Sequence, residues 1–268
     1  MTSAEQAPQQ PKVLFERQDA LARITLNRPA KLNTLDDEML DTLERLVIDI
    51  DRDPECRALV IGANGEKAFC AGADINAWGD LPPLEMWRWW TRRGHDIFGR
   101  IEELLQPSVA LVDGIAYGGG LELALSCDLL LATERSRFAF PETAVAAVPG
   151  WGGTLRLTER VGVSRAKQMI FTGDPVSADS AAEWGLVNVV YADREAMEQA
   201  AIAIIERIGR NAPVAVAAVK QLLRLHQANR YAAGAMESLA GGLTALTQDG
   251  AEGIASFRHK RSPDFHGR

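Results

Sequence analysis

The chain has two parts with different secondary-structure patterns, and this division limits the folds that it can adopt. Between residues 22 and 132, short apolar runs typical of strands alternate with amphipathic runs typical of helices. After Thr158 the pattern is almost wholly helical, apart from one short strand predicted at residues 187–190. Alternation of strands and helices indicates an α/β domain. The sequence therefore predicts an α/β core followed by a helical region, with a change of composition but no linker near residues 190–200.

The individual elements follow from the period of the apolar residues. Strands are predicted at residues 22–27, 57–62, 109–113 and 128–132, and helices between them at 36–51, 84–105 and 121–127. The later helices are predicted at residues 164–171, 178–184, 194–208, 213–228, 231–246 and 249–259. The helix at 36–51 is the clearest, because its apolar side chains recur on one stripe.

Composition describes an ordinary globular protein with no strongly charged partner. The 268 residues suffice for one large domain with a sizeable core, and 47% of them are hydrophobic. A net charge of −7 without a Lys/Arg block argues against nucleic acid or an anionic membrane surface as the main partner. No apolar run approaches the roughly 20 residues that span a bilayer, so we expect no membrane segment.

Cysteine usage and the N-terminus suggest a cytoplasmic protein. Cys56, Cys70 and Cys127 are too few and too far apart for a disulfide framework or a CxxC metal site. Residues 1–11 are polar and rich in Gln and Pro, and we expect a disordered tail there in place of a signal or transit peptide. The histidines His95, His226, His259 and His266 lack metal-ligand spacing, so we expect no metal site.

Two glutamates, twenty residues apart, carry the strongest functional signal. Glu122 closes the run Gly118-Gly119-Gly120-Leu121-Glu122, whose glycines open the backbone for a ligand at a helix N-terminus. Glu142 follows Pro141 and precedes another glycine-rich stretch at residues 149–154. Alone, an acid in a first helical turn is often only a surface residue that suits the helix dipole. A second carboxyl held nearby suits proton transfer beside a developing anion.

These runs, taken in order, resemble the enoyl-CoA hydratase/isomerase (crotonase) family from about Leu14 to the C-terminus. The matching stretches are Ile24-Thr25-Leu26-Asn27-Arg28-Pro29 with Leu32-Asn33, Ala68-Phe69-Cys70-Ala71-Gly72-Ala73-Asp74-Ile75, Gly118-Gly119-Gly120-Leu121-Glu122, Pro141-Glu142, Pro149-Gly150-Trp151-Gly152-Gly153-Thr154, Thr172-Gly173 and Ala182-Glu183-Trp184-Gly185-Leu186-Val187. The resemblance implies a crotonase-like spiral of ββα units at residues 12–195 with an acyl-CoA site. It also implies a helical trimerisation region at residues 196–268, and hence a homotrimer or homohexamer.

The resemblance further implies a hydratase chemistry. Glu122 and Glu142 fall on the two glutamate positions of hydratases, where both hold the water that adds to Cβ of a 2-enoyl-CoA thioester. Glu122 helps to deprotonate this water, and protonated Glu142 delivers hydrogen to Cα. The N–H groups of Ala73 and Gly119 are expected to form the oxyanion hole for the thioester oxygen. No separate cofactor is expected, since coenzyme A is part of the substrate.

Further substrate contacts are expected around these residues. On the basis of the resemblance they are assigned to Ala71, Asp74, Ile75, Gly118, Trp151 and Gly152. Trp151 is larger than the residue in many relatives, and its ring is a candidate to narrow the acyl end. Asn76 stands where relatives often carry a cation for CoA, so Lys31, or Lys260 from a neighbouring subunit, is the candidate replacement.

Two other functions and one structural question stay open at this point. One alternative is an isomerase that moves the double bond with a single glutamate, or another acyl-CoA enzyme of the crotonase family. The other is a non-catalytic acyl-CoA-binding or RNA-associated relative, which the two acids and both oxyanion loops disfavour. Trp87, Trp89 and Trp90 could line the acyl pocket, although consecutive helical residues cannot all face one way.

Overall fold

A six-stranded sheet forms the centre of the computed structural model, which describes residues 10–228 and 230–268 and the side chains outside 226–235. Its order is β1-β2-β3-β5-β7-β10, and only β1 and β2 pair antiparallel. The bounds are β1 Val13–Gln18, β2 Leu21–Leu26, β3 Ala58–Ala63, β5 Ser108–Val112, β7 Leu129–Thr133 and β10 Val189–Tyr191. The predicted tail at 1–11 lies almost wholly outside the described residues.

A second, four-stranded sheet carries the residues that lead into the candidate site. Its order is β4-β6-β8-β9, with bounds β4 Ala68–Cys70, β6 Ile115–Tyr117, β8 Arg137–Ala139 and β9 Val176–Ser177. The sequence pattern predicted none of these strands. Each has two or three residues, which is too short to show a period of two.

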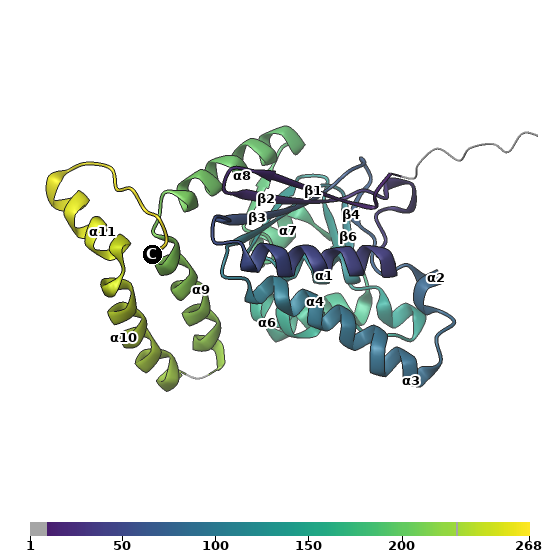
Figure 1. Cartoon of the computed structure of the whole chain (residues 1–268). Coiled ribbons are helices and arrows are strands. Elements are labelled where there is room, and N and C mark those ends of the chain that lie inside the picture. The colour runs from purple at the N-terminus through teal and green to yellow at the C-terminus, as the bar shows by residue number, and fades with distance from the viewer. Residues whose placement is uncertain (1–9, 229) are drawn as a thin grey trace, which may run out of the picture.

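Side chains on the central sheet point alternately to two apolar layers. In β3, Leu59 and Ile61 join the main core, whereas Ala58 and Val60 face the second cluster. Helices α1 (Asp37–Arg52) and α4 (Arg92–Glu103) lie on one side of the sheet, and α8 (Arg194–Gly209) covers the other (Figure 1). This arrangement confirms the predicted α/β class.

Two helices that border the candidate site depart from the simple sequence pattern. The run predicted as one helix at 84–105 consists of α3 (Pro83–Glu85), a π-helical turn η2 (Met86–Thr91) and α4. Helix α6 (Gly153–Thr172) has two helical segments on either side of Gly162, whose φ of 74° is not helical. The second segment corresponds to the predicted helix at 164–171, whereas the first was not predicted. The remaining short helices are η1 Pro29–Lys31, α2 Ile75–Trp78, α5 Gly119–Leu125, η3 Glu142–Val145 and α7 Ala178–Glu183.

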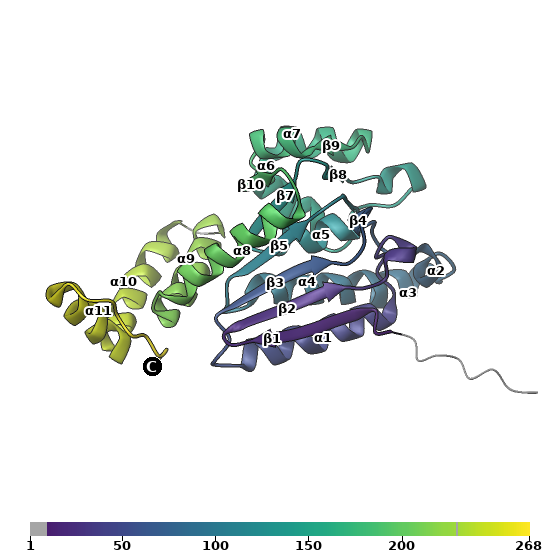
Figure 2. The same cartoon turned by 90° about the horizontal axis from the view of Figure 1, so that it is seen from above.

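Three C-terminal helices extend away from the core, as Figure 2 shows. They are α9 (Pro213–Ala228), α10 (Arg230–Leu246) and α11 (Gln248–His259). Lys220 of α9 ties this region to the core, because its Nζ donates to the carbonyl of Gln106 and pairs with Asp128 at 2.7 Å. Within the described residues, no helix combines the length and apolarity needed to cross a bilayer.

Candidate active site

Glu122 and Glu142 line the same cavity, whose volume is about 320 Å³. It lies between the segment from residue 71 to η2 on one side and α5, η3 and the loop before α6 on the other. The lining residues are Ala71, Gly72, Ala73, Trp78, Met86, Trp90, Thr91, Gly118, Gly119, Glu122, Pro141, Glu142, Ala144, Val145, Ala147, Val148, Gly150 and Trp151. The structure thus brings together the two acids that the sequence singled out.

Glu122 is held deep in the protein by backbone donors. It lies in the first turn of α5 and is only 2% exposed. Its Oε1 accepts hydrogen bonds from the amides of Trp151 at 2.7 Å and Gly153 at 2.8 Å. Gly153 must be a glycine here, because a Cβ at this position would lie 2.8 Å from Oε1 of Glu122.

Glu142 reaches the cavity from the short turn η3. Its Oε2 is buried without a hydrogen-bond partner among the described residues. Its Oε1 lies close to the backbone of Gly118, where a Cβ would stand 2.9 Å away. Gly118 also has a φ of 49°, so the turn before α5 needs glycine both for its conformation and for the approach of this acid.

Burial favours the uncharged form of both carboxyl groups. It raises the pKa of Glu122 to about 7, against the lowering effect of its amide donors and of Arg156, while the charge of Glu142 raises it further. Burial likewise raises the pKa of Glu142 to about 7. Two interacting carboxyls with similar pKa values near neutral pH share protons as a pair, so one can be ionised while the other is protonated.

The amides of Ala73 and Gly119 lie beside these acids. A Cβ at Gly119 would be 3.4 Å from the Ala73 nitrogen, which puts the two peptide groups next to each other. Within the described part of the chain, neither amide donates a hydrogen bond. Gly119 is the first residue of α5, so its N–H also carries the positive end of the helix dipole. Two adjacent donors without protein partners suit an anionic oxygen.

Aromatic side chains form part of the cavity wall. Trp151 is buried, and its ring centroid is 5.4 Å from those of both Trp90 and Phe98. The Trp151 ring also abuts α5, because a Cβ at Gly119 would meet it at 2.7 Å. Of the three clustered tryptophans, only Trp90 lines the cavity, whereas Trp87 and Trp89 are 64% and 47% exposed.

The other expected substrate contacts divide into two groups. Ala71 and Gly118 line the cavity, but Asp74, Ile75, Gly152, Lys31 and Lys260 do not. The carboxylate of Asp74 pairs with Arg28 at 2.6 Å and caps α2 through the amide of Asn76.

Three of these residues lie on the surface instead. Ile75 and Lys31 are exposed. The residue after Lys31 lies next to the segment that lines the cavity, because the Ala71 amide donates a hydrogen bond to the Leu32 carbonyl. Lys260 is an exposed residue that ends α11.

Sequence reasoning missed several residues that shape the cavity. Trp78, Met86, Thr91, Val145 and Val148 all line it. They come from α2, from η2, from η3 and from the segment between η3 and α6, whose positions depend on the tertiary fold. The usable signal was the density of large apolar residues at 78–90, outside the pattern of a simple amphipathic helix.

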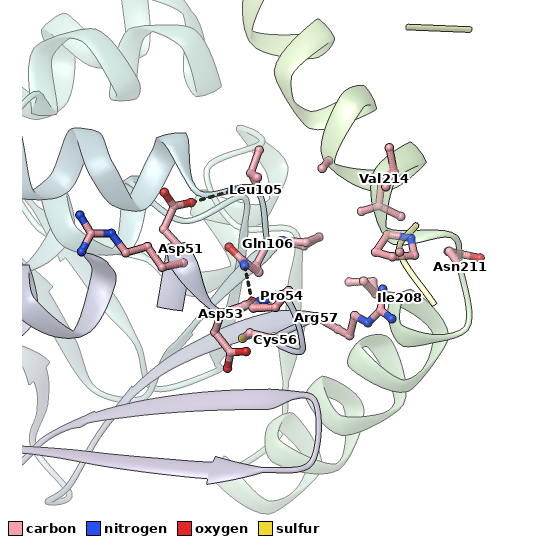
Figure 3. Close-up of a pocket in the computed structure, with 16 residues that line it drawn as sticks. Asp51, Asp53, Pro54, Cys56, Arg57, Leu105, Gln106, Ile208, Asn211 and Val214 are labelled. Atoms are coloured by element: carbon pink, nitrogen blue, oxygen red, sulfur yellow. Dashed lines mark hydrogen bonds between the residues drawn. The ribbon is translucent and has the colours of Figure 1, made fainter. Parts of the chain in front are cut away.

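A separate cavity of about 270 Å³ lies where the core meets α9 (Figure 3). Asp51, Arg57, Gln106 and Val214 are among its lining residues, and it shares none of them with the cavity that holds the glutamates. It has no buried pair of acids, and within the described residues no group of three potential metal ligands occurs. The cavity with both glutamates is therefore the candidate active site.

Known proteins of similar sequence and structure share one family. The enoyl-CoA hydratase/isomerase family profile matches residues 16–268. A short-chain-enoyl-CoA hydratase of Clostridium acetobutylicum is 39% identical over 93% of this chain and 95% of its own length. A 2,3-dehydroadipyl-CoA hydratase of Escherichia coli is 35% identical over 96% of this chain and 99% of its own.

Solved structures agree with the sequence comparison. The crystal structure of an enoyl-CoA hydratase from Bacillus anthracis superposes with a TM-score of 0.91 and 34% sequence identity, covering 96% of this chain and all of that one. The likeness extends over the core and the C-terminal helices together. The protein belongs to the enoyl-CoA hydratase/isomerase family and has its crotonase fold.

Proposed function

We propose that the protein hydrates 2-enoyl-CoA thioesters by syn addition of water. The observation that carries this proposal is a pair of glutamates, Glu122 buried and Glu142 half-buried, each with a pKa raised to about 7. They share one cavity with two amides that have no partner among the described residues. The relatives reported above, which are named as hydratases of a short-chain and of a dehydroadipyl thioester, support the reaction class.

The geometry supports a simple division of work. The thioester oxygen accepts from the amides of Ala73 and Gly119, which polarises the double bond. Glu122, ionised, takes a proton from a water molecule as the water oxygen attacks Cβ, and the negative charge moves to the thioester oxygen. Glu142, protonated, then gives its proton to Cα from the same side. One water is added in total, and a proton passing from Glu122 to Glu142 restores the pair.

The aromatic wall of the cavity supports a compact acyl group. A volume of about 320 Å³ leaves limited room beyond the reacting carbons, and Trp90 and Trp151 are among the lining residues. The single experiment that tests the function is a hydration assay of the purified protein. It compares short, long, branched and aromatic 2-enoyl-CoA thioesters, with the matching 3-enoyl-CoA as the isomerase control. Hydration of none of the 2-enoyl thioesters would contradict the proposal.

We also propose that the protein assembles as a homotrimer or a dimer of trimers. The C-terminal helices support this, because they expose large apolar side chains that a lone chain leaves in water. These residues are Val219, Leu223, Met236, Leu239, Leu243, Leu246, Ile254 and Phe257. Light scattering at micromolar concentration is expected to give a trimer or hexamer mass, and a stable monomer would contradict the assembly.

A further inference from the structure

Arg156 of α6 is an almost fully buried cation directly behind the acid pair. Its side chain is 5% exposed, and its charge is paired with Glu102 of α4 through Nε at 2.7 Å. Its Nη1 donates to the carbonyl oxygen of Trp151 at 2.8 Å. A buried arginine that pairs with an acid and also binds a backbone carbonyl fixes that peptide group firmly, since its planar fork holds both partners in one geometry.

The peptide that Arg156 holds belongs to the loop that binds Glu122. Trp151 accepts from Arg156 through its carbonyl and donates to Glu122 through its amide. Gly153, two residues on, supplies the other amide. Between them Gly152 has a φ of 99°, and a Cβ there would overlap the Arg156 guanidinium. The guanidinium therefore packs against the same short turn that aims both donors at the carboxylate.

The other charged groups around Arg156 and Glu122 are few. Glu142 and Arg156 are the charges that act on the Glu122 carboxyl. Around Arg156, Glu102 also meets Arg224 of α9 at 3.5 Å, and Glu159 interacts with Glu102, Arg156 and Arg224. Glu102 therefore pairs both with Arg156 and with Arg224 of α9.

We infer that Arg156, anchored by Glu102, is a positioning residue that presents the amides of Trp151 and Gly153 to Glu122. It does not itself line the substrate cavity. The hydrogen bonds from the two backbone amides and the charge of Arg156 all lower the pKa of Glu122, whereas burial raises it. Arg156 thereby keeps Glu122 able to ionise near neutral pH. The kinetic part of this inference rests on the proposed hydratase function.

The test compares Arg156→Lys with Arg160→Lys. Lysine keeps the charge but cannot bind Glu102 and the Trp151 carbonyl in the same fork. We expect kcat to fall by about 10²-fold with KM within a few-fold, because small displacements of a catalytic group cost this much. The rising limb of the kcat–pH profile, set by Glu122, should move to higher pH. Arg160 is the matched control: it is on the same helix, and it binds the carbonyls of Cys127 and Asp128 instead of the loop.

The pH profile separates positioning from a merely structural role. If Arg156→Lys lowers the melting temperature but leaves the pH profile and kcat as in Arg160→Lys, the inference is overturned. Glu102→Gln, which preserves shape, covers the case in which Arg156→Lys does not fold. It should shift the profile in the same direction by less, and an unshifted profile would overturn the inference too.

A readout without turnover keeps the two proposals distinguishable. Isotope-edited infrared titration, assigned with Glu122→Gln, follows ionisation of the Glu122 carboxyl in protein without substrate. The pKa of Glu122 should be higher in Arg156→Lys than in the wild type and unchanged in Arg160→Lys. If the wild type hydrates no enoyl-CoA, the proposed function fails while this titration still decides the role of Arg156.

Discussion

The surroundings of Glu122 and those of Glu142 differ in construction although burial raises both pKa values alike. Glu122 lies inside a buried helix with two amide donors on one oxygen, whereas Glu142 lies on a short turn with one buried oxygen that finds no partner in the described part of the chain. Donors to a carboxylate favour its ionised form, and Glu142 receives a bond from its own backbone amide where Glu122 receives two from the loop. The comparison therefore favours Glu122 as the base that takes the proton of water and Glu142 as the acid.

The largest expected effect comes from removing either acid. Glu122→Gln and Glu142→Gln should each lower the hydration rate by at least ~10²-fold, while binding of a CoA ester stays within a few-fold. Gln preserves size and hydrogen bonding but cannot transfer the proton. Steady-state kinetics and calorimetric titration with a saturated acyl-CoA measure the two quantities.

The two single variants also separate hydration from isomerisation. Full activity in either one contradicts the two-acid mechanism. A rate lost only in one, together with conversion of a 3-enoyl-CoA, would support the isomerase that the sequence left open.

A second effect concerns stability and pH. A carboxyl whose folded pKa is about 7, against an ordinary value of 4.5, favours folding fully at pH below 4.5 and loses that contribution as pH rises through 7. The Glu122 contribution is up to about 3 kcal/mol. Glu122→Gln should therefore be more stable than the wild type at about pH 8 and similar to it near pH 4.5.

Urea denaturation at both pH values measures the difference in the free energy of unfolding between Glu122→Gln and the wild type. Groups that titrate identically in the two proteins cancel in this difference. Glu142→Gln provides the comparison for the more weakly enclosed acid, and we expect the same sign with a smaller gain. A stability difference that stays constant from pH 4.5 to 8 would show that Glu122 titrates normally.

Two glycines of α4 test how tightly this helix packs against Trp151. A Cβ at Gly94 of α4 would overlap the Trp151 indole, whereas a Cβ at Gly99 meets nothing within 4 Å. Gly94→Ala should lower the free energy of unfolding by about 1–3 kcal/mol through overpacking. Gly99→Ala should raise it by about 0.5–1 kcal/mol, because alanine favours the helix.

Thermal unfolding of both glycine variants makes this measurement. Equal stabilities would mean that Trp151 does not pack tightly on α4. The expected hydration rate is also lower in Gly94→Ala alone, because a displaced Trp151 carries its amide away from Glu122.

The sequence predicted the acid pair because Glu122 ends a run of glycines and Glu142 precedes another glycine-rich stretch. Such glycines indicate backbone that a ligand or a side chain approaches closely. It predicted the long elements for a related reason: α1 and α8 show a period that one buried face imposes on its own. The three-residue strands β4, β6 and β8 carry no such period, and their pairing depends on the segments that they join.

Other features of the site depend on contacts between distant segments. The role of Arg156 follows from Glu102 and Trp151, which lie 54 and 5 residues away in the chain. Trp78 and Met86 reach the cavity only because the π-helical turn and α2 fold over it. The density of large apolar residues at 78–90 is their signal in the sequence, and it does not show which of them face the cavity.

The smallest expected effect on activity concerns Trp151, which lines the cavity and whose ring packs against Trp90 and Phe98. Trp151→Ala should raise activity on long-chain relative to short-chain enoyl-CoA by about tenfold, since one or two methylenes gain room. Its backbone amide, which binds Glu122, is retained, so the reaction itself should survive.

Loss of the indole should also cost about 3–5 kcal/mol of stability, so Trp151→Phe serves as the milder variant. Trp87→Ala is the matched control, because Trp87 belongs to the same aromatic run but is exposed and outside the cavity lining. The ratio of long-chain to short-chain kcat/KM should rise in the order Trp87→Ala, Trp151→Phe, Trp151→Ala. An unchanged ratio in folded Trp151→Ala would mean that Trp90, with the remaining lining residues, sets the acyl length, and that Trp151 serves only to pack α4 against α5.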